Sequence, residues 1–101
     1  MKITIGNKSI TSVDFSNAET AWMIKDSILI LEHFKSKKKI VLGGDILTEK
    51  LEYTYDSWYY TVESRQNSEF NVECSIKAAF EYISNYIRAN GNRFYVIFVT
   101  E

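Results

Sequence analysis

The sequence has no proline and very few of the residues that build catalytic and metal sites. It contains one histidine, one cysteine and four glycines among 101 residues. The single cysteine, Cys74, excludes an internal disulfide and favours a reducing compartment. A nucleophilic Cys74 would need a base, for which His33 is the one candidate, and no His or Cys cluster has the spacing of zinc ligands. We therefore expect no catalytic residue, metal, cofactor or enzymatic activity, and a structural role for Cys74.

Long apolar segments are missing as well. The longest uninterrupted apolar run is Phe94–Val99, whose six residues fall far short of the roughly 20 that span a bilayer. The first ten residues, MKITIGNKSI, lack the apolar stretch of a secretion signal. These features predict a cytoplasmic protein without a membrane partner.

Neither sign of charge is in clear excess. Lys and Arg number 12, Asp and Glu number 13, and the formal net charge is −1. This balance excludes a strongly basic nucleic-acid module of the simple kind. With 46% apolar and 25% charged residues, the composition is that of a soluble globular protein, and we expect residues 1–101 to form a single domain.

Alternation of polar and apolar residues predicts strands in the first half of the chain. Residues 2–5 and 10–13 are expected to form a hairpin that turns at Gly6-Asn7. Residues 40–42 are expected to form a short strand that ends at Gly43-Gly44. The two glycines lack the pattern of a phosphate-binding loop, so we interpret them as a strand end or turn with unusual backbone angles.

Two further strand regions follow. Residues 52–63 are rich in Tyr, Thr, Trp and Val, and they predict one strand, or two joined by a bend near Asp56-Ser57. Residues 64–67 are expected to be a loop. The nearly continuous apolar segment 93–100 is typical of a strand in the middle of a sheet that is covered on both faces.

Helical periodicity predicts two helices. Ser16 and Glu19 fit a capping box for a helix over about residues 17–34. One face of this helix would carry Ala21, Ile24, Ile28 and Leu31. A second helix is predicted over 68–90, with Asn90-Gly91 as its C-terminal stop. Its apolar stripe comprises Val72, Ile76, Ala79, Phe80, Ile83 and Ile87.

The predicted order is therefore one or two strands, a helix, two strands, a helix and a last strand. Strands and helices are mixed without strict alternation. This order favours an α+β fold in which two helices pack on one mostly antiparallel sheet, whose outer strands would have open edges.

Charge is segregated along the chain. Residues 45–81 carry eight acidic and three basic residues, a net charge of −5, whereas residues 1–44 have a net charge of +3. The acidic segment also holds a run of Tyr and Trp. Strand alternation turns inward either Trp58, Tyr60 and Val62 or Tyr59 and Thr61. We favour the first set, which leaves Tyr59 on the outer face. Aromatic anchors and complementary charge suit binding to a basic partner. The residues that we predict to contact this partner are Asp45, Glu52, Tyr55, Asp56 and Tyr59.

A basic cluster offers the alternative hypothesis. Lys35, Lys37, Lys38 and Lys39 crowd the end of the first predicted helix. Cations are favoured there by the helix dipole, which explains the cluster without any ligand. The alternative is a small nucleic-acid-binding module that uses these lysines together with exposed tyrosines.

Two motifs carry a resemblance to a known family. The stretch VLGGDILTEKLEYTYDSWYYTVES, residues 41–64, resembles the bacterial family immunity protein 40. Members of that family have a hydrophobic strand that ends in Leu-Gly-Gly-Asp and then a Thr-Tyr-Asp-x-Trp-Tyr segment, which here are Leu42–Asp45 and Thr54–Tyr59. The resemblance covers about residues 38–100. A looser similarity extends to the immunity protein of a tRNA-cleaving colicin, which also has an Asp after a Gly at a strand end and a Trp further on.

The resemblance implies a function without catalysis. Such proteins accompany the toxins of polymorphic toxin and contact-dependent inhibition systems, commonly nucleases, and neutralise them by binding the toxin's C-terminal domain. The similarity to the colicin inhibitor further implies an acidic, aromatic surface that imitates an RNA substrate. Gly43, Gly44 and Trp58 are motif residues that we expect to define the fold, and less distinctive loop residues would then share in toxin contact.

Overall fold

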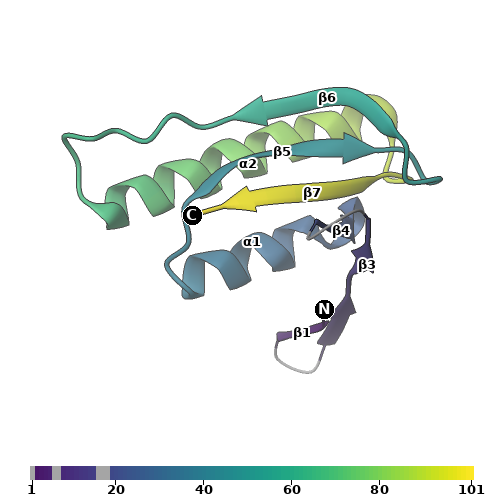
Figure 1. Ribbon diagram of the computed structural model, residues 1–101, viewed down its shortest axis with the longest axis horizontal. Coiled ribbons are helices and arrows are strands. Elements are labelled where there is room, and N and C mark those ends of the chain that lie inside the picture. The colour runs from purple at the N-terminus through teal and green to yellow at the C-terminus, as the bar shows by residue number, and fades with distance from the viewer. Residues whose placement is uncertain (1, 6–7, 16–18) are drawn as a thin grey trace.

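The apolar segment near the C-terminus forms the middle strand of a five-stranded sheet (Figure 1). The computed structural model describes residues 2–5, 8–15 and 19–101. In the sheet order β3-β4-β7-β5-β6, strand β7 (Tyr95–Thr100) lies between β4 (Thr20–Met23) and β5 (Val41–Leu47), and each neighbouring pair is antiparallel. The edges are β3 (Val13–Asp14) and β6 (Tyr53–Tyr59). The α+β fold and the central position of the last strand are thus confirmed, although its Val99 is 46% exposed.

The first residues form a separate two-stranded hairpin. Strand β1 (Lys2–Ile5) pairs with β2 (Lys8–Thr11), so the returning strand begins two residues earlier than the predicted segment 10–13. Its predicted turn at residues 6–7 lies outside the described residues. Ile3 and Ile10 pair across the hairpin, and both are buried in the main core.

The predicted helix over residues 17–34 is wrong in its first half. Residues 20–23 form β4, a 3₁₀ turn η1 (Ile24–Asp26) follows, and helix α1 (Ser27–Ser36) begins ten residues later than expected. Ser16, the predicted cap, lies outside the described residues. A short apolar run fits a strand covered on both faces as well as a helix. Ala21 is buried on one face of the sheet and Trp22 on the other, so pairing with β7 decides the outcome.

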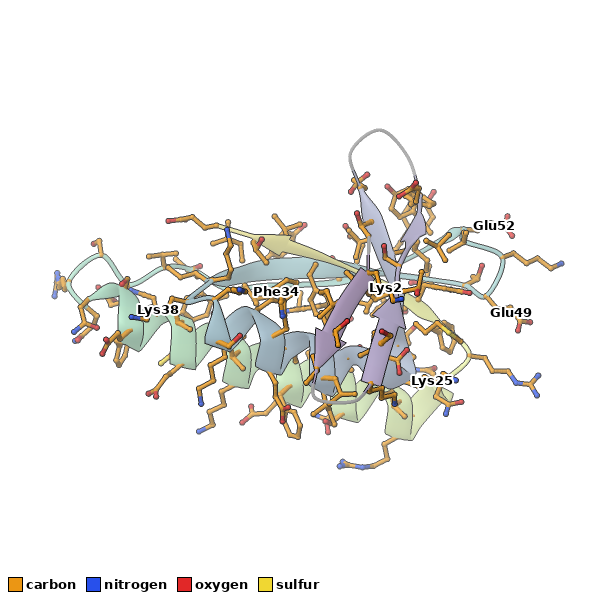
Figure 2. The ribbon with its side chains drawn as sticks, turned by 90° about the horizontal axis from the view of Figure 1, so that it is seen from below. Lys2, Lys25, Phe34, Lys38, Glu49 and Glu52 are labelled. Carbon is orange, nitrogen blue, oxygen red and sulfur yellow. The ribbon has the colours of Figure 1, made fainter. Side chains whose placement is uncertain are left out.

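The helical face predicted from Ala21 to Leu31 consequently does not form. Ile24 and Leu31 are buried, but Ile28 is 50% exposed on α1. Both helices lie on the same side of the five-stranded sheet (Figure 2). The opposite face has its own small buried cluster, formed by Ala21, Leu47 and Ile97.

The long helix α2 (Ser68–Asn90) has the bounds that its periodicity predicts. Its N-cap is Asn67, whose side-chain oxygen accepts a hydrogen bond from the backbone N–H of Phe70 at 2.8 Å. Gly91 ends the helix with a positive φ of 88°, which glycine adopts without a steric penalty. Of the predicted stripe, Phe80 points outward and is exposed, and the others are buried or half-buried.

Strand β5 continues through Gly43-Gly44 to Leu47, so the prediction that the strand ends at the glycines is wrong. The reason is that β5 is paired on both sides, with β6 and with β7. A Cβ on Gly43 would overlap the carbonyl oxygen of Trp58, and Gly43 has a φ of 151°. A Cβ on Gly44 would overlap the Ile97 carbonyl oxygen and the Trp58 ring. Glycine is therefore required here by the close approach of neighbouring strands and of one indole.

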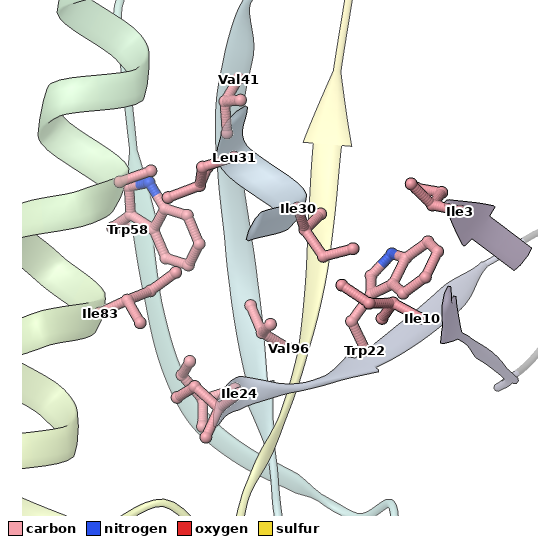
Figure 3. Close-up of a cluster of buried hydrophobic side chains, with 12 residues drawn as sticks. Ile3, Ile10, Trp22, Ile24, Ile30, Leu31, Val41, Trp58, Ile83 and Val96 are labelled. Carbon is pink, nitrogen blue, oxygen red and sulfur yellow. The ribbon is translucent and has the colours of Figure 1, made fainter. Parts of the chain in front are cut away.

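Two tryptophans lie among aliphatic side chains in the core between sheet and helices (Figure 3). The Trp58 ring stacks on Tyr82 of α2, with centroids 5.0 Å apart, and meets the edge of Phe98 of β7 at 5.9 Å. Trp22 belongs to the same core, beside Ile3 and Ile10 of the hairpin. The two tryptophans thus join β6 to α2 and the hairpin to the sheet.

Candidate functional site

The candidate surface is built on β6, an edge strand whose two faces differ. Trp58 is buried against the helices, whereas Tyr59 is 86% exposed on the opposite side of the strand. The alternation predicted for this stretch is confirmed. Tyr55 is also exposed, to 89%. Two large aromatic side chains therefore stand almost wholly in solvent on one short strand.

A local irregularity explains the exposure of Tyr55. Its φ is +69°, and the register between β5 and β6 shifts between Asp45 and Leu47, the mark of a β-bulge. The Thr54 hydroxyl donates to the carbonyl oxygen of Ile46 at 2.8 Å and accepts from the backbone N–H of Asp56 at 3.1 Å, which fixes the bulge. The strand bends at Tyr55, one residue before the predicted bend at Asp56-Ser57.

Asp56 faces the helical side of the edge. One of its carboxylate oxygens accepts a hydrogen bond from the Tyr86 hydroxyl of α2 at 2.9 Å. Burial raises the pKa of Tyr86, and its hydrogen bond to Asp56 raises the pKa further. Burial and the charge of Asp56 likewise raise the pKa of Tyr82. Asp56 is therefore an exposed carboxylate held in one place by a neutral tyrosine.

Asp45 lies on the other face, where β5 places it opposite Ser57 of β6. Partial burial raises the pKa of Tyr53, and the negative charges of Glu19 and Asp45 raise it further. The Tyr53 ring lies 6.2 Å from that of Tyr55. A carboxylate and neighbouring tyrosines thus share the sheet face that no helix covers.

Glu52 stands at the beginning of the same strand. It closes a tight turn in which the Thr48 backbone N–H donates to the Glu52 carbonyl oxygen at 2.8 Å, and its own backbone N–H donates to the Thr48 hydroxyl at 3.2 Å. Its side chain is exposed. We call Asp45, Glu52, Tyr55, Asp56 and Tyr59 the β6 surface. Tyr55, Asp56 and Tyr59 lie on β6, Glu52 directly precedes it, and Asp45 lies on the neighbouring strand β5, so that Asp45 and Asp56 are on opposite faces of the sheet.

The other candidate residues occupy ordinary positions. Lys35 lies in the last turn of α1 and Lys37 caps it, where the helix dipole favours positive charge. His33 is half-buried in the same turn, and Cys74 is a half-buried free thiol on α2. Across residues 2–5, 8–15 and 19–101, no group of three or more His, Cys, Asp or Glu side chains is placed to hold a metal ion.

Sequence reasoning missed two buried polar residues of α2. Asn71, 2% exposed, accepts hydrogen bonds from the Tyr60 hydroxyl and the Glu63 backbone N–H, both at 2.8 Å, and donates to the carbonyl oxygens of Glu63 and Asn67, both at 3.1 Å. Ser75 accepts from the Val41 backbone N–H at 2.9 Å. The spacing of the helix could have revealed them, because residues 71 and 75 precede the buried Ala79 by eight and four positions and so lie on the same face.

No helix among the described residues is long and apolar enough to cross a membrane.

Of the comparisons with known proteins, the one with protein families agrees with the sequence motifs. No curated protein matches the chain, and no solved structure does. A model of the family immunity protein 40 matches residues 9–100. This range includes Gly43 and Gly44 of β5, the whole of β6 and both α-helices. The match spans nearly the entire chain, so this protein belongs to the immunity protein 40 family.

Proposed function

We propose that the protein binds a cognate bacterial toxin in the cytoplasm and neutralises it by covering the active site with the β6 surface. Membership of an immunity-protein family supports a toxin partner. We propose that the toxin is a nuclease of the RNase kind and that the protein itself performs no chemistry. The part of the toxin that the protein binds would be the C-terminal domain of a polymorphic toxin.

The observation that carries the proposal is the exposure of Tyr55 and Tyr59 within the acidic part of the chain. Both rings are more than 80% exposed, and the three charged members of the β6 surface, Asp45, Glu52 and Asp56, are all acidic. Large aromatic side chains in a partly apolar, partly polar setting are favoured anchors of protein interfaces. A nuclease active site attracts a polyanion and is therefore basic. An acidic surface with aromatic anchors is complementary to such a site.

The β6 surface also suits fast and tight association. Inhibition of a lethal enzyme requires the inhibitor to capture it before it acts, and unlike charges raise association rates. The fixed carboxylate of Asp56, held by the Tyr86 hydroxyl at 2.9 Å, loses less conformational freedom on binding than a mobile one. A specific interface would bury about 800 Å² on each partner, which a chain of this size can supply.

The test is co-expression with the C-terminal domain of the toxin encoded by the neighbouring gene. Growth rescue together with a 1:1 complex on co-purification is the expected result. Continued killing without a complex would contradict the proposed function for that toxin.

The four exposed lysines at the end of α1 favour one alternative, direct binding of nucleic acid. That binding should be detectable at low salt and weaken steeply as salt rises. Replacing Lys37, Lys38 and Lys39 with alanine should then abolish it. Absence of binding at low salt would remove this alternative.

A further inference from the structure

Strand β6 is an open edge of the sheet within the part of the chain that the structure describes. It pairs with β5 on one side, and it ends the strand order (Figure 1). The opposite edge, β3, has only two residues. An unpaired edge offers backbone donors and acceptors to another chain, and proteins commonly blunt such edges with bulges or charges. The bulge at Tyr55 blunts one half of β6 and leaves the half from Ser57 to Tyr59 regular.

The hydrogen bonds fix which backbone groups of that half face outward. The Tyr60 backbone N–H donates to the Leu42 carbonyl oxygen at 2.8 Å, so Tyr60 points toward β5. Backbone groups alternate in direction along an antiparallel strand. Trp58 therefore also points toward β5, whereas Ser57 and Tyr59 direct their N–H and C=O groups away from the sheet.

The charges around this edge select the kind of chain that fits it. Asp45 lies on one face beside Ser57, Asp56 lies on the other face, and Glu52 stands at the start of the strand. A second copy of this chain, paired edge to edge about a two-fold axis, would bring these same acids together, which is unfavourable. A strand with basic side chains on both of its faces would instead meet a carboxylate on each.

We propose that the toxin docks by adding an extended, basic segment to the Ser57–Tyr59 edge of β6, which enlarges the five-stranded sheet by one strand. Backbone hydrogen bonds to Ser57 and Tyr59 align the segment. On one face its Lys or Arg side chains contact Asp56, and on the other a long basic side chain reaches across β6 to Asp45 of β5. Tyr55 and Tyr59 then pack over the added strand. This inference rests on the proposed function and specifies how the same surface is used.

Amide hydrogen exchange, measured by NMR on the free protein and on its 1:1 complex with the toxin domain, tests the docking mode. Trp58, whose amide belongs to the ladder with β5, serves as the internal control and should be protected in both states. The amides of Ser57 and Tyr59 should exchange freely in the free protein and become protected in the complex by at least tenfold. A complex in which both exchange as before would overturn the edge inference alone, whereas failure of the parent chain to form a complex would overturn it together with the proposed function.

A pair of variants at Ser57 separates backbone pairing from side-chain contact. Ser57→Pro removes the outward N–H and leaves the ladder with β5 intact, whereas Ser57→Ala keeps that N–H. We expect Ser57→Pro to weaken binding by about tenfold, the value of one good hydrogen bond, and Ser57→Ala to bind like the parent. Equal affinities for a folded Ser57→Pro variant and the parent would overturn the inference. Circular dichroism establishes that each variant is folded, and the exchange measurement decides the question should the proline variant not fold.

Discussion

Replacement of Asn71 with alanine should destabilise the protein far more than a polar residue on a helix ordinarily would. The amide is buried and makes four hydrogen bonds, to the Tyr60 hydroxyl, to both backbone groups of Glu63 and to the Asn67 carbonyl oxygen. These bonds attach the segment between β6 and α2 to the helix. Loss of the Asn71 side-chain amide would therefore loosen the C-terminal end of β6 as well as the helix.

The magnitude follows from the number of bonds and the exposure of the partners. Each hydrogen bond contributes about 1 kcal/mol net. Glu63 is exposed, so water can replace part of the hydrogen bonding that its backbone groups would lose. Tyr60 is half-buried, so its hydroxyl is replaced less readily by a water partner. We expect Asn71→Ala to lower the free energy of unfolding by about 2–3 kcal/mol, a large share of the 5–15 kcal/mol typical of a domain.

Urea denaturation followed by tryptophan fluorescence measures this change. Asn85→Ala is the matched control, because Asn85 is an exposed residue of the same helix whose side chain bonds only Arg88 in the described structure, and it should change stability by about 0.5 kcal/mol or less. Asn71→Asp should be at least as harmful as Asn71→Ala at neutral pH, because a buried carboxylate would face two carbonyl oxygens. A loss below 1 kcal/mol for Asn71→Ala would refute the reasoning.

Three further predictions concern the sheet, the surface and the tyrosines. Gly44→Ala should cost about 3 kcal/mol or more in denaturation experiments, because its methyl group would meet a backbone carbonyl and an indole that cannot move aside; a near-neutral result would contradict the close approach of the strands. Tyr59→Ala combined with Asp56→Ala should weaken toxin binding in calorimetry while leaving the protein folded, and undiminished protection in the growth assay would show that the interface lies elsewhere. The raised pKa of Tyr86 means that the folded state holds the phenolic proton more tightly than the unfolded state, whose pKa is about 10. The resulting stabilisation is therefore present below about pH 10 and is lost as the pH rises through the folded pKa. Tyr86→Phe should show a smaller loss of stability between pH 8 and pH 11 than the parent, and an identical loss in both proteins would contradict this assignment.

Local signals in the sequence determined the second helix, the last strand and part of the candidate surface. The limits of α2 follow from a regular apolar period and from a glycine that accepts a φ of 88°. The central place of β7 follows from an apolar segment too continuous for an exposed edge. Strand alternation places Trp58 and Tyr59 on opposite faces, and Tyr59 is on the exposed one, as we favoured. Each of these features depends on neighbours within one element, which is why composition and spacing reveal it.

The tertiary structure decided the features that depend on residues distant in the chain. Residues 20–23 form β4 because β7 pairs with them, against a helical pattern of similar strength. Gly43-Gly44 lies inside β5 and not at its end, because β6 and β7 approach it from both sides. The bulge that exposes Tyr55 and the tyrosine that holds Asp56 likewise arise from β5 and α2. Spacing along one segment carries no information about which strand will lie beside it, so the two faces and the open edge of β6 appear only when the sheet is assembled.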